Sequence, residues 1–121
     1  MKKTLSQNIW LSRQKKDKYF HLSKKEGFRS RAAYKLIEIE SKYKVIKKKQ
    51  NIVDLGSAPG SWSQALLKIL ENKSSSKILA IDINDMKPIK NIIFLKKDIK
   101  NLLEEESFLL PIDNIGLVLS D

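Results

Sequence analysis

Two glycines and two aspartates lie at or just after the ends of predicted strands. Their residue types and their spacing are typical of a site that binds a nucleoside. Gly56 and Gly60 lie in "DLGSAPG", where glycine lets the backbone bend tightly and approach a ligand closely. Asp82 follows Gly60 by 22 residues, and an acidic residue at about that distance can bind both ribose hydroxyls. Asp98 ends the next predicted strand, where it can meet the base. The spacing therefore predicts a site for a ribose and its base.

The same turn excludes two common nucleotide sites. The G-x-G-x-x-G spacing is absent and Pro59 occupies the approach, so an NAD-dependent oxidoreductase fails on its glycines. No Gly-Lys-Ser/Thr follows the turn, which excludes a P-loop. Asp54, inside the preceding strand, is expected to brace the turn by accepting backbone N–H bonds. Any one of these aspartates alone also fits ordinary loop or capping chemistry, but three successive strand ends in this pattern favour a ligand site.

Strands and helices alternate beyond residue 50. The pattern predicts strands over residues 51–56, 77–83, 91–98 and 114–121, helices over 61–70 and 99–108, and a loop over 72–76. The strand over 77–83 is apolar almost throughout, which is typical of a strand covered on both faces. The fold class is therefore α/β, with a doubly wound, mostly parallel sheet.

Basic charge is concentrated in the first 50 residues. The net charge of the chain is +10; residues 1–50 carry 16 Lys and Arg against 4 Asp and Glu, and residues 51–121 carry 8 against 10. Aromatic residues are interleaved with this charge: Trp10, Tyr19, Phe20, Phe28, Tyr34 and Tyr43. A basic segment attached to a near-neutral body is typical of a protein that binds a polyanion such as RNA. The alternative is a solvated basic face that aids solubility.

The basic segment is expected to contain an arm and one helix. Residues 1 to about 20 lack clear periodicity and predict a flexible or weakly helical arm. Ser30 can cap a helix that then runs through "RAAYKLIEIESKY", with Arg31, Lys35 and Glu38 on one face. The N-terminus lacks the apolar core of a signal peptide, and no apolar run of about 18 residues occurs, so a cytoplasmic protein without a membrane segment is expected. With no cysteine and the single histidine His21, no metal site is expected.

The last predicted strand ends at Asp121, the last residue of the sequence. Four strands are only about half of a usual doubly wound domain. We therefore expect either a fragment or a chain whose sheet is completed by a partner.

Two long motifs make the chain recognisable. "RSRAAYKL" and "DLGSAPGSWSQ", followed by "IDINDMKPI", "KKDIK" and "VLSD", resemble the FtsJ/RrmJ family of S-adenosylmethionine-dependent ribosomal RNA large subunit (uridine-2′-O-)-methyltransferases. The resemblance begins at about residue 10 and covers nearly the whole chain. It implies a Rossmann-like S-adenosylmethionine methyltransferase fold, of which about the first half, up to "LSD", is present.

The resemblance also implies a cofactor site. S-adenosylmethionine is the expected cofactor. Gly60 and Trp62 match the family's contacts to its methionine and sulfonium end, Asp82 the ribose contact and Asp98 the adenine contact. Asp121 matches the aspartate beside the methyl donor.

Catalytic and RNA-binding residues follow in the same way. Lys35 and Asp121 match the first lysine and the aspartate of the family's catalytic Lys-Asp-Lys-Glu set, and the helix bearing Lys35 is expected to pack beside the last strand. The other lysine and the glutamate lie downstream of "SD" in the family. Four cations of the basic segment are expected to bind RNA phosphates: Lys24, Lys25, Arg29 and Arg31.

We therefore expect two functional parts, an RNA-contacting basic arm and helix over residues 1–50 and the N-terminal half of a cofactor-binding domain over 51–121. The expected reaction is transfer of a methyl group to the 2′-hydroxyl of a uridine in large-subunit ribosomal RNA. The expected partner is that RNA or the assembled large subunit, with a second chain as a candidate source of the missing half. The alternatives are a catalytically incomplete RNA-binding remnant and half of a split enzyme.

Overall fold

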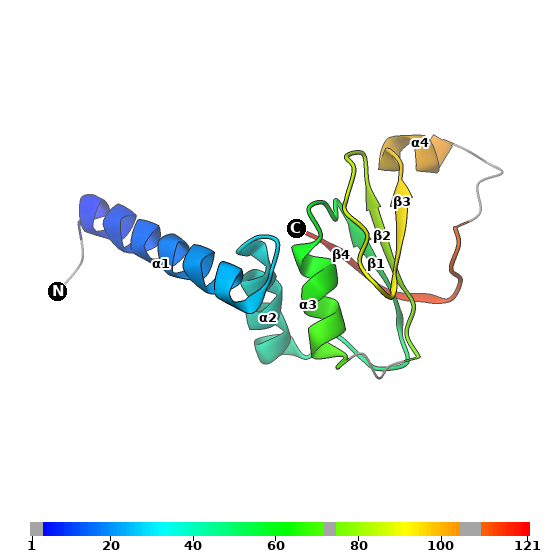
Figure 1. The fold of residues 1–121 in the computed structure, drawn as a ribbon, viewed down its shortest axis with the longest axis horizontal. Helices are drawn as coiled ribbons and strands as arrows, with labels where there is room; N and C mark the ends of the chain where they lie inside the picture. The colour runs from blue at the N-terminus through cyan, green and yellow to red at the C-terminus, as the bar shows by residue number, and fades with distance from the viewer. Residues whose placement is uncertain (1–3, 72–74, 105–109) are drawn as a thin grey trace.

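Four parallel strands form one sheet in the order β3-β2-β1-β4 (Figure 1). The computed structural model describes residues 4–71, 75–104 and 110–121. The strands are β1 (Asn51–Leu55), β2 (Ile78–Asp82), β3 (Ile92–Lys96) and β4 (Ile115–Ser120). All four predicted strands are confirmed, and so is the α/β fold class. Because the strands are parallel, their carboxyl ends share one edge of the sheet.

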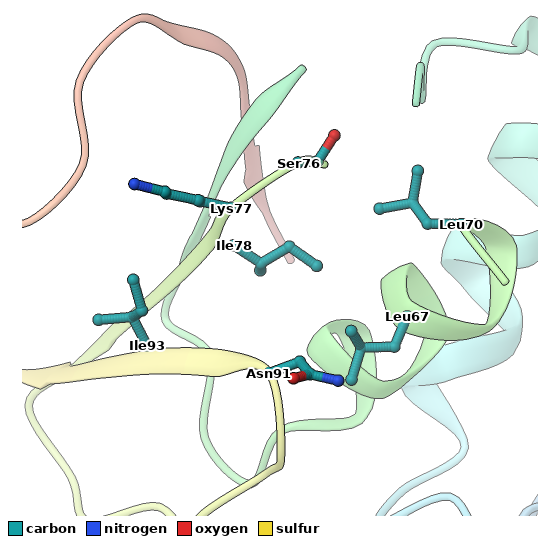
Figure 2. A pocket seen from close by; sticks show the side chains of 7 residues that line it. All are labelled: Leu67, Leu70, Ser76, Lys77, Ile78, Asn91 and Ile93. Carbon is teal, nitrogen blue, oxygen red and sulfur yellow. The ribbon is translucent and has the colours of Figure 1, made fainter. Parts of the chain in front are cut away.

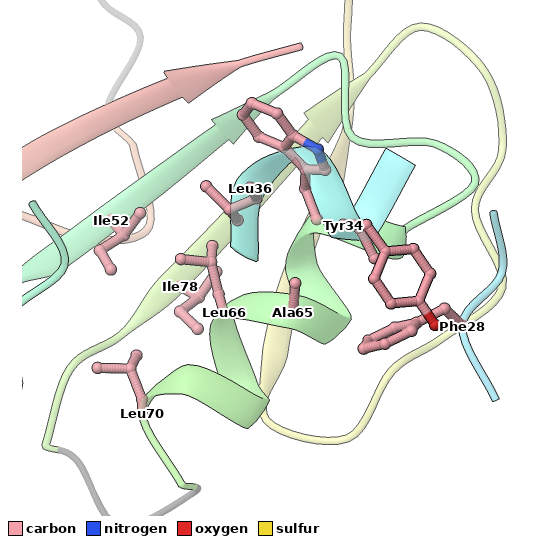
Figure 3. Packing of buried hydrophobic residues seen from close by; sticks show 10 residues of the cluster. Phe28, Tyr34, Leu36, Ile52, Ala65, Leu66, Leu70 and Ile78 are labelled. Atoms are coloured by element: carbon pink, nitrogen blue, oxygen red, sulfur yellow. The ribbon is translucent and has the colours of Figure 1, made fainter. Parts of the chain in front are cut away.

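One face of the sheet is covered by α2 (Ala32–Tyr43) and α3 (Ser61–Ile69). Side chains of both helices point toward Ile52 and Ile78 on the strands (Figure 3). Leu36 and Leu66 are fully buried, and burying a leucine stabilises a fold by about 1.5–3 kcal/mol. These helices therefore fix the positions of the residues that flank the carboxyl edge.

The opposite face has a smaller core. Val53, Leu79, Ile81 and Ile112 form its buried cluster. Val118 lies beside Val53 in the register of β4 and is 56% exposed. A short helix, α4 (Ile99–Glu104), follows β3; residues 105–108 of the predicted helix, like residues 72–74 of the predicted loop, lie outside the described residues.

Of the two alternatives predicted for residues 1–20, a flexible or a weakly helical arm, the described part is helical: α1 (Leu5–Glu26) is a continuous helix that projects from the body (Figure 1). Thr4 and Gln7 form a capping box at its start, each side chain accepting a hydrogen bond from the other's backbone N–H. Gly27 ends the helix in the left-handed conformation, and the Phe28 N–H donates to the Ser23 carbonyl, as in a Schellman motif. Local caps, rather than a buried apolar stripe, define this helix.

Helix α2 begins at Ala32, with Arg31 rather than Ser30 at the cap position. The Ser30 hydroxyl accepts the Ala32 N–H at 3.3 Å and donates to the Ser61 hydroxyl at 2.7 Å. Ser30 therefore joins the starts of α2 and α3. None of the helices in the described ranges is long and apolar enough to cross a membrane.

Candidate functional site

The turn after β1 is held against the end of β2. The N–H groups of Gly56 and Ser57 donate to the Ile81 carbonyl at 2.8 and 3.1 Å. The buried Asp82 carboxylate accepts the N–H groups of Ala58 and Asn84, both at 2.8 Å. Asp82 thus braces the turn, the role that was predicted for Asp54.

Asp54 instead joins β1 to α3. Its carboxylate is buried and accepts a hydrogen bond from the Ser63 hydroxyl at 2.8 Å. Burial, with smaller contributions from the charges of Asp121 and Asp82, raises the pKa of Asp54 from its ordinary value of 3.8 to about 6, against the lowering effect of the hydrogen bonds from Ser63. This carboxyl group therefore titrates close to neutral pH.

A cavity of about 310 Å³ lies at the carboxyl ends of the strands. It is lined by Leu55, Gly56, Ile81, Asp82, Ile83, Lys97, Asp98, Ile99 and Ser120. The structure therefore brings Asp82 and Asp98 to one cavity, as the spacing predicts. One Asp98 oxygen accepts the Lys100 N–H at 2.9 Å. An open α/β sheet binds ligands at this edge.

Gly60 begins α3 in a conformation reserved for glycine, with φ of 115°. A Cβ at this position would lie 2.9 Å from Ile89 Cδ1 and 3.1 Å from both Arg29 Nη1 and Met86 Sδ. The first N–H groups of α3 have no acceptor within the helix, which makes this end suited to an anion such as a carboxylate.

The indole of Trp62 belongs to the core. It is buried, and its Nε1 donates to the Ala32 carbonyl at 2.8 Å. The indole is therefore not placed to contact a cofactor. The cofactor contact of Trp62 stays a prediction, and only its backbone N–H, in the first turn of α3, could make it. The burial of Trp62 could be predicted from the sequence, because Trp62 is the first residue of the apolar stripe of this helix.

Arg29 acts as an internal clamp, and its predicted role in binding RNA phosphates stays a prediction. Its guanidinium donates to the carbonyls of Pro59, Lys87 and Pro88 at 2.9, 2.6 and 3.1 Å. The Arg29 N–H donates to the Gln64 side chain at 2.8 Å. These bonds tie the segment before α2 to the glycine turn, to the loop after β2 and to α3. A guanidinium engaged in this way is not free to bind a phosphate bidentately.

Lys35 and Asp121 meet at the end of β4. Lys35 Nζ donates to Asp121 Oδ1 at 2.8 Å, which confirms that α2 packs beside the last strand. The Lys35 side chain is 64% exposed and that of Asp121 35%. Exposed ion pairs contribute only about 0–1 kcal/mol to stability, so stability does not explain this arrangement.

A larger cavity of about 710 Å³ lies between α1 and α2 and includes Lys35 and Asp121 in its lining. We call it the α1–α2 groove. Lys24 and Arg31 line it, whereas Lys25 is exposed in the last turn of α1 outside the lining. Ser120 lines the strand-end cavity and Asp121 the groove, so two consecutive residues at the end of β4 line the two spaces.

Another hollow, of about 270 Å³, lies at the opposite edge of the sheet (Figure 2). Its lining is mostly apolar: Leu67, Leu70, Ile78 and Ile93, with Ser76, Lys77 and Asn91. It faces the amino ends of β2 and β3, so we give it no part in the nucleoside site. Within the described ranges, no group of three or more His, Cys, Asp or Glu side chains could hold a metal ion.

One buried polar atom near the turn was missed by sequence reasoning. The Ser57 hydroxyl is buried and has no hydrogen-bond partner among the described residues. Buried hydroxyls are nearly always paired, so an unpaired one beside the turn is unusual. A serine inside a glycine turn gave no signal of its own.

Comparison with known proteins agrees with this geometry. The model of the FtsJ-like methyltransferases matches residues 28–121. The chain is 42% identical to a ribosomal RNA large subunit methyltransferase E from Ehrlichia chaffeensis, over 97% of this chain and 55% of that protein, and 42% identical to one from Chromobacterium violaceum, over 100% and 59%. A solved structure named as a ribosomal RNA methyltransferase from Plasmodium falciparum aligns with a TM-score of 0.65 and 38% identity, over 78% of this chain and 56% of that one. The chain thus spans little more than half the length of these relatives.

Proposed function

This chain belongs to the FtsJ-like methyltransferase family, and on that premise we propose that it transfers a methyl group from S-adenosylmethionine to a ribose 2′-hydroxyl of large-subunit ribosomal RNA. The observation that carries the proposal is the Lys35–Asp121 pair, which lines the α1–α2 groove directly after Ser120 of the strand-end cavity. The family supports the cofactor, and the names of the relatives support the RNA. That the acceptor is a uridine rests on the resemblance of the motifs.

The residues of the strand-end cavity fit S-adenosylmethionine. Asp82 and Asp98 are acceptors for ribose and adenine. The free N–H groups of Ser61 and Trp62 at the start of α3 suit a carboxylate, such as that of the methionine part. Aspartates, backbone donors and a tight glycine turn are the groups that this ligand requires.

S-adenosylmethionine supplies an electrophilic methyl group on its sulfonium. Asp121 orients the Lys35 ammonium through their hydrogen bond. A fixed cation beside the attacking 2′-oxygen stabilises the negative charge that develops there and holds the RNA in place. Lys35 and Asp121 therefore position the acceptor, and the glycine turn positions the donor.

The basic segment supplies the RNA-binding surface in this proposal. Lys24 and Arg31 line the α1–α2 groove and Lys25 lies beside it on α1, so these three cations are the candidate phosphate ligands. Residues 1–50 would contact RNA while residues 51–121 hold the cofactor. A location in the cytoplasm remains a prediction from the sequence.

A methyl-transfer assay tests the proposal. The protein is incubated with tritiated S-adenosylmethionine and an unmodified transcript of large-subunit ribosomal RNA. A 2′-O-methyl group blocks alkaline cleavage of the adjacent phosphodiester, so label in alkali-resistant dinucleotides is the expected result, lost in Lys35→Ala and Asp121→Asn. Label on a base would contradict the proposal.

A second candidate is an RNA-binding protein that retains the cofactor site without turnover. The motif resemblance favours it in one respect. The family's catalytic set has four members, Lys-Asp-Lys-Glu, and only two of them are matched within residues 1–121, by Lys35 and Asp121. Binding of both S-adenosylmethionine and RNA without transfer would support it. Transfer that appears only with a second chain would support a split enzyme.

A further inference from the structure

Four aromatic rings line the α1–α2 groove next to the Lys35–Asp121 pair: Tyr19, Phe20, Phe28 and Tyr34. Three of them pack on one another. Tyr19 and Tyr34 stack with centroids 5.1 Å apart, and Phe28 meets Tyr34 edge to face at 5.5 Å. The Tyr19 hydroxyl donates to Glu38 at 2.8 Å, which fixes this wall to α2.

Phe20 is different, because its ring remains 44% exposed on the groove. The Lys24 ammonium lies 4.5 Å from the centre of this ring, and the His21 ring meets it edge on at 5.6 Å. Phe20 keeps this exposed surface in spite of both contacts, so a base has access to it. An exposed ring beside a lysine is the arrangement with which proteins stack nucleic-acid bases.

The charge of the groove selects the ligand class. Lys16, Lys24, Arg31 and Lys35 line it, and the acidic side chains in the lining are already engaged, Glu38 by Tyr19 and Asp121 by Lys35. The groove therefore combines aromatic surface with an excess of positive charge, to which Lys16 and Arg31 contribute without an ion pair in the described part of the chain. Duplex RNA presents phosphates but buries the faces of its bases, whereas an unpaired nucleotide presents both.

We propose that the α1–α2 groove binds an unpaired nucleotide adjacent to the one that is methylated, with its base stacked on Phe20 and its phosphate bound by Lys24 or Arg31. The proposal rests on the function proposed above and names its substrate class: a single-stranded or looped-out RNA segment, not a continuous duplex. Because Lys35 and Asp121, the proposed catalytic pair, also line the groove, this nucleotide lies next to the acceptor ribose.

Stacking and phosphate binding are separable by experiment. Fluorescence anisotropy would measure the affinity of the full chain for a labelled single-stranded oligoribonucleotide and for the same strand in a blunt duplex, over a range of salt. Phe20→Leu keeps an apolar side chain but removes the ring. It is expected to weaken single-strand binding about tenfold, to leave duplex binding unchanged and to leave the salt slope unchanged. Phe20→Trp should restore the affinity.

Two variants serve as controls. Trp10→Leu removes an aromatic ring that is 60% exposed on the same helix but outside the groove, so the ratio of single-strand to duplex affinity should not change. Arg31→Gln should weaken binding of both RNAs and reduce the single-strand salt slope by about 0.7.

A base analogue reports stacking directly. An oligoribonucleotide that carries one 2-aminopurine should lose fluorescence on binding, and Phe20→Leu should abolish that loss. The proposal would be overturned if Phe20→Leu lost equal affinity for the single strand and the duplex, or if it lost no affinity for either. Calorimetry with S-adenosylmethionine on the same variants keeps the two proposals apart, since failure to bind it would count against the proposed function and not against the groove.

Discussion

Lys35 and Asp121 lie 86 residues apart in the chain, yet the Lys35 ammonium donates to the Asp121 carboxylate at 2.8 Å. The pair lines the α1–α2 groove, and Ser120, the residue before Asp121, lines the strand-end cavity. An exposed ion pair adds little to stability, so its effect should be seen in turnover.

Removal of this pair should reduce methyl transfer without loss of the fold. Lys35→Ala and Asp121→Asn are expected to lower the transfer rate by about 100-fold or more, the usual loss when a charge-stabilising group is removed. The free energy of unfolding should change by less than about 1 kcal/mol. Lys42→Ala changes an exposed lysine at the end of the same helix and should alter neither quantity. Equal activity of Lys35→Ala and Lys42→Ala would remove Lys35 from the mechanism.

The two neighbouring arginines should have opposite effects. Arg29→Ala releases the glycine turn and the loop after β2, so it should weaken S-adenosylmethionine binding by at least about tenfold, because it removes several charge-assisted hydrogen bonds. Arg31→Ala removes an exposed cation of the groove and should weaken RNA binding while S-adenosylmethionine affinity is kept. Calorimetry and RNA anisotropy on both variants test this. The clamp would be refuted by an Arg29→Ala variant that loses only RNA affinity.

The glycines of the turn differ in what they tolerate. Gly60→Ala places a Cβ 2.9 Å from Ile89 Cδ1 at φ of 115°, so it should destabilise the fold by about 1–3 kcal/mol and distort the start of α3. Gly56 has φ of 68° and open space around it, so Gly56→Ala should lose only about 1–2 kcal/mol. Urea denaturation of both variants measures the difference. A smaller loss for Gly60→Ala than for Gly56→Ala would be inconsistent with the close packing of this turn.

Asp54 should make stability depend on pH in an unusual direction. Its pKa is raised from 3.8 to about 6 by burial, so between these values the folded protein binds more protons than the unfolded chain. Its contribution is therefore most favourable below the unfolded value, and it falls as the pH rises through the window, by up to about 3 kcal/mol.

Asp54→Asn removes this titration while keeping an acceptor for Ser63. The stability of the variant relative to the native protein should therefore increase between about pH 4 and pH 7, as measured by urea denaturation. A difference that stays constant across this range would show that Asp54 does not titrate there.

Local pattern was enough to predict the sheet, because each strand carries its own apolar run and parallel strands share one carboxyl edge. The extent of helix α1 was underestimated, because its ends are defined by the Thr4–Gln7 capping box and the Gly27 cap, whereas its periodicity is weak. Those caps are visible in the sequence as "TLSQ" and "EGF".

The hydrogen bonds of Arg29, Asp82 and Asp54 could not be predicted from the sequence, for physical reasons. Arg29 donates to backbone carbonyl groups, which every residue carries. The residue types of Lys87 and Pro88 therefore do not mark them as its acceptors. Asp82 and Asp54 have the same side chain in successive strands, and only the path of the chain decides which braces the turn and which binds Ser63. The Lys35–Asp121 pair was reached through the family motifs and not through spacing.

Calorimetric titration of the purified chain with S-adenosylmethionine tests the central claim most directly. The account predicts binding at one site per chain, weakened by Asp98→Asn, which changes the cavity, and unaffected by Asp113→Asn, an exposed aspartate outside the cavity lining. Circular dichroism on the same samples establishes that each variant is folded. A folded chain that binds no S-adenosylmethionine, or binds it equally well with Asp98→Asn, would contradict the assignment of the strand-end cavity as the cofactor site.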